Sequence, residues 1–224
     1  MIPSLPALLC VTLLLPFVAI PAAKAQEFSA TIVSTSPEGD QTNAGRGHVR
    51  VAYGKVRLEL PDFPDGYFLI DPAANIADFV RPAQRVFMEA RQSSRLAQIL
   101  IPVDPDAPCR QWQAVAEITK LSGSQEAWHC TASGKERVDD RDTVRYLAVA
   151  PDGHPYDIWI DPMVKFPVKI RAEIHAVITV TDIKEGPQPA AAFEIPAGFS
   201  KFDPQGLIDR IKQSDVWVEK PPPQ

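Results

Sequence analysis

The chain has 224 residues and carries 23 Lys and Arg against 28 Asp and Glu, which gives a formal net charge of −5 at pH 7. An acidic chain without a basic cluster in its sequence is a poor candidate for binding nucleic acid or an anionic membrane surface, so no nucleic-acid partner is expected. Proline occurs 23 times, roughly twice its usual share, which indicates many short elements rather than long helices.

The first 25 residues are predicted to be a signal peptide. Residues 5–20 are almost entirely apolar, and Ala23-Lys24-Ala25 has the small-x-small pattern of a signal-peptidase site, so cleavage after Ala25 is expected. The alternative is an uncleaved segment that anchors the protein in the inner membrane, although Pro16 and Pro21 disfavour a stable spanning helix. We therefore expect export to the periplasm and one mature domain at 26–203, followed by a short helix and a frayed tail at 204–224.

Short strands dominate the first part of the mature chain. Residues 49–60 alternate between apolar and charged side chains, with Val56, Leu58 and Leu60 on one face, which is typical of a half-buried antiparallel strand. Gly54 marks a bend within this run. Turn-like sequences separate the other predicted strands of this part, at 28–33, 67–70, 76–80 and 85–89.

Two short helices are predicted after these strands. The first begins near Ser94, carries Leu96 and Ile99 on one side and ends before Pro102. The second begins at about Pro108, because a helix tolerates proline in its first turn. Both helices present an apolar side that needs a partner surface.

Cys109 and Cys130 are the cysteines that remain after the predicted cleavage. In an exported chain an isolated pair is most simply a disulfide, and loop entropy gives such a bridge about 3 kcal/mol. It would tie the start of the second helix to a strand. A redox or metal pair is the alternative, because His129 precedes Cys130, but a zinc site needs more ligands than these.

Strands return after residue 128 and include a hairpin at 156–170 and a further strand, after which a turn at 184–187 is expected to end the sheet. In the hairpin, Trp159 is expected on one face between Asp157 and Asp161. The two aspartates lie about 13 Å apart on ordinary strand geometry, which is too far for the paired carboxyls of a glycosidase. We expect them to form a solvated rim around a packed tryptophan.

Catalytic motifs are missing from the sequence. The histidines, at 48, 129, 154 and 175, are far apart and match no metal-ligand or triad pattern, and there is no nucleophile elbow, phosphate-binding loop or dinucleotide fingerprint. We therefore expect a protein that is not an enzyme and has no cofactor or bound metal. A hydrolase with dispersed catalytic residues is the alternative.

The one-sided strands and short helices together predict an α+β, β-rich fold, in which helices cover the apolar face of a strongly curved antiparallel sheet. Such a sheet encloses an apolar space that is either filled by side chains or open to a lipid. The candidate residues that would line this space are Val56, Leu58, Leu60, Leu96, Ile99, Phe166, Val168 and Ile170.

Several motifs resemble the LolA-like periplasmic lipoprotein-carrier superfamily. They are GKVRLEL at 54–60, FLIDP at 68–72, IWIDP at 158–162 and FPVK at 166–169. The closing DIKEGPQP at 182–189 and FEIPAGF at 193–199 resemble, more narrowly, an uncharacterised exported bacterial family related to it. The resemblance covers most of 28–203 and implies an unclosed β-barrel of about eleven strands with a helical lid, whose cavity accepts acyl chains in the carriers.

No residue here matches an individual ligand-gating residue of the carriers, and their usual pattern lacks the cysteine pair. The resemblance therefore supports the fold of this protein better than it supports a carrier activity. Our leading hypothesis is a monomeric, non-enzymatic periplasmic protein that binds a lipid, an acyl chain or a lipoprotein in an apolar cavity. The alternative is an envelope interaction or sensor module with a filled barrel, which recognises other envelope proteins through its surface.

Overall fold

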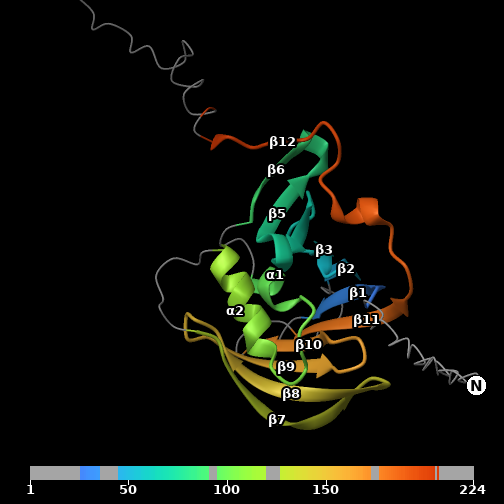
Figure 1. The fold of residues 1–224 in the computed structure, drawn as a ribbon. Coiled ribbons are helices and arrows are strands. Elements are labelled where there is room, and N and C mark those ends of the chain that lie inside the picture. Colours follow the sequence, from blue (N-terminus) through green and yellow to red (C-terminus); the bar gives the residue numbers. More distant parts are fainter. Residues whose placement is uncertain are drawn as a thin grey trace, which may run out of the picture.

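The computed structural model describes residues 26–35, 45–90, 95–119, 127–172, 177–204 and 206. They form one sheet of twelve strands and two short α-helices (Figure 1). The predicted signal peptide lies outside the described residues, as does the predicted tail helix with Leu207, Ile208 and Ile211.

Each predicted strand and both predicted helices within the described ranges form, with boundaries close to those expected. The strands are β1 (Phe28–Thr35), β2 (Gly45–Ala52), β3 (Lys55–Glu59), β4 (Tyr67–Asp71), β5 (Ile76–Arg81), β6 (Val86–Glu89), β7 (His129–Val138), β8 (Arg141–Val149), β9 (Pro155–Asp161), β10 (Phe166–Ala172), β11 (Val177–Glu185) and β12 (Ser200–Lys201). The α-helices are α1 (Arg95–Ile99) and α2 (Pro108–Thr119), and the short 3-10 helices are η2 (Pro72–Ala74), η3 (Pro82–Gln84) and η4 (Ala190–Phe193).

The sheet is curved but not closed. Its strand order is β12-β6-β5-β4-β3-β2-β1-β11-β10-β9-β8-β7, and the two end strands do not pair with each other. It wraps around the helices, which lie on its concave side (Figure 1). The predicted fold class is thereby confirmed. One detail differs: the sheet does not end at the 184–187 turn, because Ser200 and Lys201 return to pair in parallel with β6 as a twelfth strand.

Local turn chemistry explains the tight meander of the first half. Tyr53 and Gly54 join β2 to β3 with φ of 56° and 74°, the left-handed conformation that two-residue hairpin loops require. The β4–β5 and β5–β6 connections share another device, in which a proline starts a 3-10 turn and a left-handed residue, Asn75 or Arg85, ends it. Asp71 also caps the first of these turns, because its carboxylate accepts a hydrogen bond from a backbone amide.

The main core lies between the concave face of the sheet, here called the inner face, and the helices. Alternate residues of β1, β2 and β3 are buried there, as their apolar–polar alternation predicts. Strand β4 differs, because Tyr67, Phe68, Leu69 and Ile70 are all buried, which requires cover on both faces of the sheet.

The C-terminal segment after β11 supplies that second cover. It crosses the convex, outer face of β3–β6 before its last residues pair with β6. Phe193 packs with Ala52, and Ile195 and Phe199 pack on the outer cluster formed by Tyr67, Leu69 and Val80. The outer face is therefore apolar under this segment and polar beyond it.

Candidate functional site

The predicted lining residues all belong to one apolar cluster on the inner side of the sheet. Seven of the eight are no more than 3% exposed, and Leu96 is partly buried against the same cluster. In the structure these side chains pack against one another and against the helices. The structure thus brings the predicted set together, and contact with a ligand stays a prediction for each member.

Helix α2 covers the gap that the unclosed sheet leaves. It contacts β5 and η2 on one side and β7 on the other, so it bridges strands from the two halves of the sheet (Figure 1). Trp112 anchors it: this side chain is fully buried, packs on Trp128 with ring centroids 5.5 Å apart, and donates a hydrogen bond from Nε1 to the Ile99 carbonyl at 3.0 Å. We call residues 95–119 the helical cover.

The polar ties of the helical cover are one-sided. Between described residues they all lead to the β7–β10 half: the Val103 amide donates to the Lys165 carbonyl at 2.9 Å, and Tyr146 donates to the Pro105 carbonyl at 2.7 Å. The Trp128 amide donates to the Gln113 side chain at 3.0 Å, and an ion pair joins Arg95 to Asp152. Against the β2–β6 half, the described contacts of the cover are apolar packing.

The predicted disulfide also attaches the helical cover to the β7–β10 half of the sheet. Cys109, in the first turn of α2, is bonded to Cys130 in β7, and their Cα atoms lie 5.8 Å apart. This is an ordinary separation for a bridged pair. The bond fixes the start of α2 to the β7 edge, as the position of the cysteines in the sequence predicts.

In the β2–β6 half of the sheet, aromatic side chains gather around β4 and β5. Phe63, Phe68 and Phe79 pack edge to face or tilted, with centroid separations of 4.9 to 5.8 Å. Phe63 and Phe79 are only partly buried. We call the boundary between the helical cover and β4–β5 the seam. It is apolar and has no described polar tie across it.

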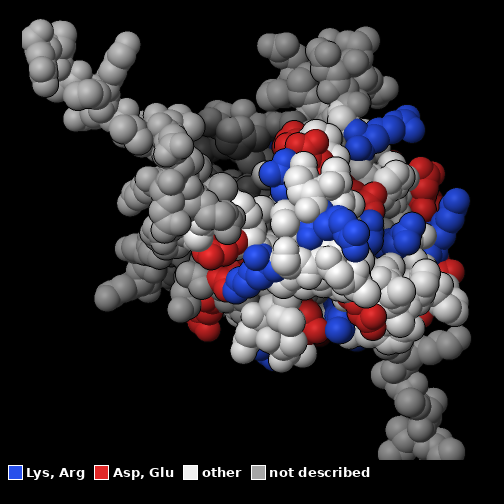
Figure 2. Space-filling view, turned by 90° about the horizontal axis from the view of Figure 1, so that it is seen from above, with Lys and Arg blue, Asp and Glu red and all other residues white. Residues whose placement is uncertain are grey.

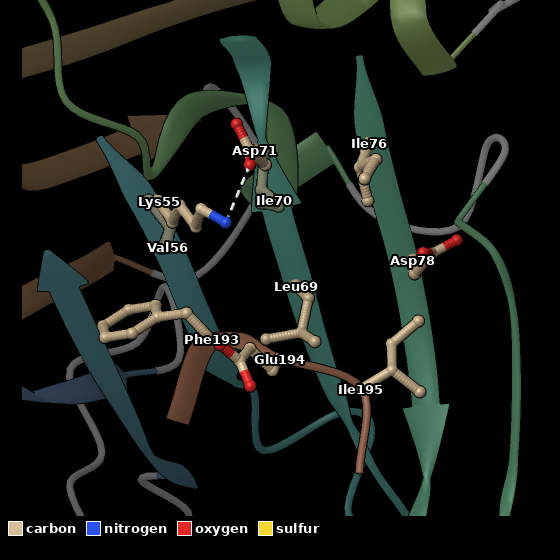
Figure 3. Close-up of a pocket in the computed structure, with 10 residues that line it drawn as sticks. All are labelled: Lys55, Val56, Leu69, Ile70, Asp71, Ile76, Asp78, Phe193, Glu194 and Ile195. Carbon is tan, nitrogen blue, oxygen red and sulfur yellow. Dashed lines mark ion pairs between the residues drawn. The ribbon is translucent and has the colours of Figure 1, made fainter. Parts of the chain in front are cut away.

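A separate small pocket lies on the outer face, beneath the C-terminal segment (Figure 3). Its volume is about 240 Å³, and an ion pair of 3.1 Å between Lys55 and Asp71 closes one side. Burial raises the pKa of Asp78 on its wall, although the positive charge of Lys201 acts against this rise. The lining residues are Lys55, Val56, Leu69, Ile70, Asp71, Ile76, Asp78, Phe193, Glu194 and Ile195.

The hairpin aspartates are not a solvated rim, and that expectation is wrong. Asp161 is 1% exposed: it caps the β9–β10 turn by accepting hydrogen bonds from the Met163 and Val164 amides and pairs with Arg141 at 2.6 Å. The sequence could not show this because Arg141 comes from a strand that only the fold brings alongside. Trp159 does lie on the outer face, as expected.

Asp157 and Trp159 form the centre of a charged cluster on that face. Burial favours a higher pKa for Asp157, but hydrogen bonds from Arg171 and Arg145 outweigh it and lower the pKa. The same two guanidinium groups, together with Lys169, lie over the Trp159 ring at 4.8 to 5.5 Å. Every charge in this cluster has a partner, so it indicates a structural role.

The described residues offer no metal site, since no group of three or more His, Cys, Asp or Glu side chains among them could hold an ion. Within the same residues no helix is long and apolar enough to cross a membrane. His48 lies on β2 and His129 on β7, at opposite parts of the sheet, and His175 falls outside the described residues.

Two features of this region are not predicted by the sequence. The first is the outer pocket, for which the unbroken apolar run of β4 was the available signal, since it indicates a strand covered on both faces. The second is the Trp112–Trp128 contact under the cover, which joins residues from a helix and from the residue before a strand. No pattern in the sequence pairs Trp112 with Trp128.

No family model and no curated protein matches the sequence. Solved structures do match. PNGF-II is 12% identical over 84% of this chain with a TM-score of 0.52, and the chain spans about a third of the length of PNGF-II. A chain in the complex of MucA and MucB from Pseudomonas aeruginosa is 16% identical to this protein. The match covers 77% of this chain and 56% of the matched chain, with a TM-score of 0.36.

The LolA superfamily protein NE2245 from Nitrosomonas europaea is 12% identical, over 76% of this chain and 90% of its own, with a TM-score of 0.34. At these identities the likeness concerns the fold alone. A LolA superfamily protein is thus among the solved structures that match this chain.

Proposed function

We propose that the protein is an exported, non-enzymatic binding protein that holds an acyl chain, from a lipid or an acylated protein, between the inner face of its sheet and the helical cover. The observation that carries the proposal is the one-sided attachment of the cover. Its disulfide and described polar ties lead to β7–β10, whereas the seam with β4–β5 is apolar. The cover is therefore built to swing away from the seam while it stays attached at the other side.

The free energies involved are of similar size. Opening the cover exposes apolar side chains such as Ile99, Leu100 and Trp112, at about 1.5–3 kcal/mol each, or roughly 8–15 kcal/mol for about five residues. An acyl chain of about 16 carbons gains roughly 13 kcal/mol at about 0.8 kcal/mol per methylene when it takes their place. An exchange of side chains for an acyl chain is thus close to balanced, which is what reversible binding requires.

The test is lipid binding by the purified protein. Organic extraction and mass spectrometry should find co-purified lipid, and a brominated fatty acid should quench the fluorescence of Trp112 and Trp128, which lie under the cover. Trp159 lies on the outer face, so Trp159→Phe is the control and should leave most of the quenching in place. Trp112→Phe should reduce it.

Two results would reject the proposal. One is the absence of both extracted lipid and quenching at micromolar fatty acid. The other is quenching that disappears in Trp159→Phe and persists in Trp112→Phe, because the fatty acid would then lie on the outer face.

A second candidate function rests on the buried state of the predicted lining residues. Since seven of the eight are no more than 3% exposed, the interior is filled in this state, which favours an envelope interaction module that recognises a partner by its surface. A protein that captures no lipid under the conditions above, yet gives a reproducible protein partner on crosslinking in cells, would support this alternative.

A further inference from the structure

Cationic side chains from separate parts of the chain meet on the outer face of β11, β1 and β2. In the strand register, Ser29 of β1 lies opposite Lys184 of β11 on one side and opposite Arg50 of β2 on the other. Neighbouring strands are about 4.8 Å apart, so Lys184 and Arg50 stand roughly 10 Å apart with the Ser29 hydroxyl between them. We call these three residues the cationic row.

The cationic row has no described counter-ion. Lys184 and Arg50 are exposed, and neither makes an ion pair with any residue that the structure describes. The next arginine along the row, Arg57, differs, because it pairs with Glu59 at 2.9 Å and lies over the Tyr67 ring at 3.6 Å. Within the described part of the chain, two cations are therefore left without an ion pair next to a neutral hydroxyl.

The row lies in a groove rather than on a flat sheet. The groove has a volume of about 730 Å³, and Gln188 and Pro189 of the C-terminal segment form part of its wall. His48 and Glu59 are shared with a second groove of about 680 Å³, which extends to the 61–66 loop. Polar side chains dominate, and the acidic groups that line the first groove are Glu59 and Asp182.

The groove could not be predicted from the sequence, because its cations are far apart along the chain. In the view from above, Lys and Arg side chains lie together across the middle of the surface, and Asp and Glu side chains lie around them (Figure 2). Folding therefore brings together charges that are distant in the sequence. A chain with a net charge of −5 thus carries local positive surface.

We propose that the cationic row binds a phosphoryl group. A phosphoryl group offers several oxygens, which accept hydrogen bonds from the Lys184 ammonium, the Ser29 hydroxyl and two guanidinium N–H groups of Arg50. The polar walls of the groove exclude an acyl chain as its occupant. The inference does not rest on acyl binding, because the row and the helical cover lie on opposite faces of the sheet.

The source of the phosphoryl group is a lipid headgroup or a soluble phosphate compound, and two probes distinguish them. Inorganic pyrophosphate is titrated calorimetrically into the purified protein, and vesicles of phosphatidylglycerol with phosphatidylcholine are compared in sedimentation with vesicles of phosphatidylcholine alone. Binding of either anionic probe should weaken as salt is raised from about 0.05 M to about 0.5 M, since screening shortens the range of charge attraction.

Substitutions locate the site. Arg50→Gln and Lys184→Gln should each weaken probe binding about tenfold, the effect of losing one charge-assisted hydrogen bond, and Asp182→Asn should strengthen it. Lys135→Gln removes the same charge from an exposed position on β7, far from the groove, and should leave binding unchanged. Circular dichroism confirms that each variant is folded.

Sedimentation with phosphatidylglycerol vesicles but no response to pyrophosphate assigns a lipid headgroup, and a response to pyrophosphate assigns a site open to soluble phosphates. The proposal is overturned if neither probe binds, or if Lys135→Gln weakens binding as much as Arg50→Gln does. Failure of the fatty-acid test alone leaves these results unaffected, so the two proposals fail separately.

Discussion

Removing the Cys109–Cys130 disulfide should loosen the helical cover before it affects the rest of the sheet. The bridge joins residues 21 positions apart, and loop-closure entropy for a loop of that length gives about 3 kcal/mol at 25 °C. Because the bond joins the start of α2 to β7, its loss releases the strongest attachment of the cover on the side where its polar ties gather. Strands β9 and β10 keep all their partners.

The assay is amide hydrogen exchange followed by mass spectrometry on the Cys109→Ser/Cys130→Ser double variant. A loss of about 3 kcal/mol corresponds to roughly a 150-fold change in an opening equilibrium, since about 1.4 kcal/mol is tenfold. Amides of α2 should therefore exchange up to about 150 times faster, and amides of β9 and β10 much less so. Urea unfolding of the same variant gives the global change for comparison.

Exchange in α2 that stays within about twofold of the wild-type rate would refute the reasoning, because the bond would then contribute nothing to holding the cover. Equal acceleration in α2, β9 and β10 would also refute it, since the cover would then open only when the whole domain unfolds. Reduced wild-type protein serves as a second sample, in which no atom other than the sulfur atoms has changed.

Three further predictions concern single residues. Trp112→Ala should lower the free energy of unfolding by about 3–5 kcal/mol in urea, because it empties a fully buried site and removes a hydrogen bond within the cover. Asp161→Ala should cost about 3 kcal/mol in the same assay, since it uncaps a turn and leaves Arg141 without its buried partner. The pKa of Asp157 is lowered, so its ionised form stabilises the fold above about pH 4. This contribution to the free energy of unfolding is lost as the pH falls further. Asp157→Asn should therefore flatten that part of the acid unfolding curve.

Each of these three predictions has a control or an outcome that would contradict it. Exposed Met163, in the same turn as Asp161, should tolerate alanine within about 0.5 kcal/mol. A cost below about 1 kcal/mol for Trp112→Ala would mean that the cover does not pack as described. An acid unfolding curve that is identical with and without the Asp157 carboxyl would contradict the assigned role of its two arginine partners.

The features that the sequence predicts correctly are those that local interactions determine. The alternation at Val56, Leu58 and Leu60 predicted which face of β3 is buried, and the curved antiparallel sheet with short helices followed from many such patterns. The cysteine count predicted the disulfide in the same way, because only one pairing was possible. These inferences needed no knowledge of which strand lies beside which.

The features that were wrong or missed depend on which elements the fold places side by side. Asp161 looks like a surface carboxylate until β8 places Arg141 beside it. The two residues of β12 have no periodic pattern of their own and pair with β6 only because the C-terminal segment crosses the outer face. The cationic row requires Lys184, Ser29 and Arg50 to be adjacent, and three separate strands supply them.

The way the sheet is completed bears directly on whether it can open. If further strands closed the gap between β12 and β7, opening it would break a ladder of backbone hydrogen bonds, and each broken bond would leave polar groups unpaired in an apolar interior. A helical cover closes the gap instead, and α2 satisfies its own backbone within the helix. Moving the cover away from the seam therefore exposes side chains but leaves the strand ladders intact, and an apolar ligand can compensate for exposed apolar side chains. For this reason the seam along β5, the strand of Phe79, rather than the β7 edge, is where an acyl chain should enter. Phe79→Asp should block its uptake, whereas the outer-face substitution Arg50→Gln should leave it unchanged.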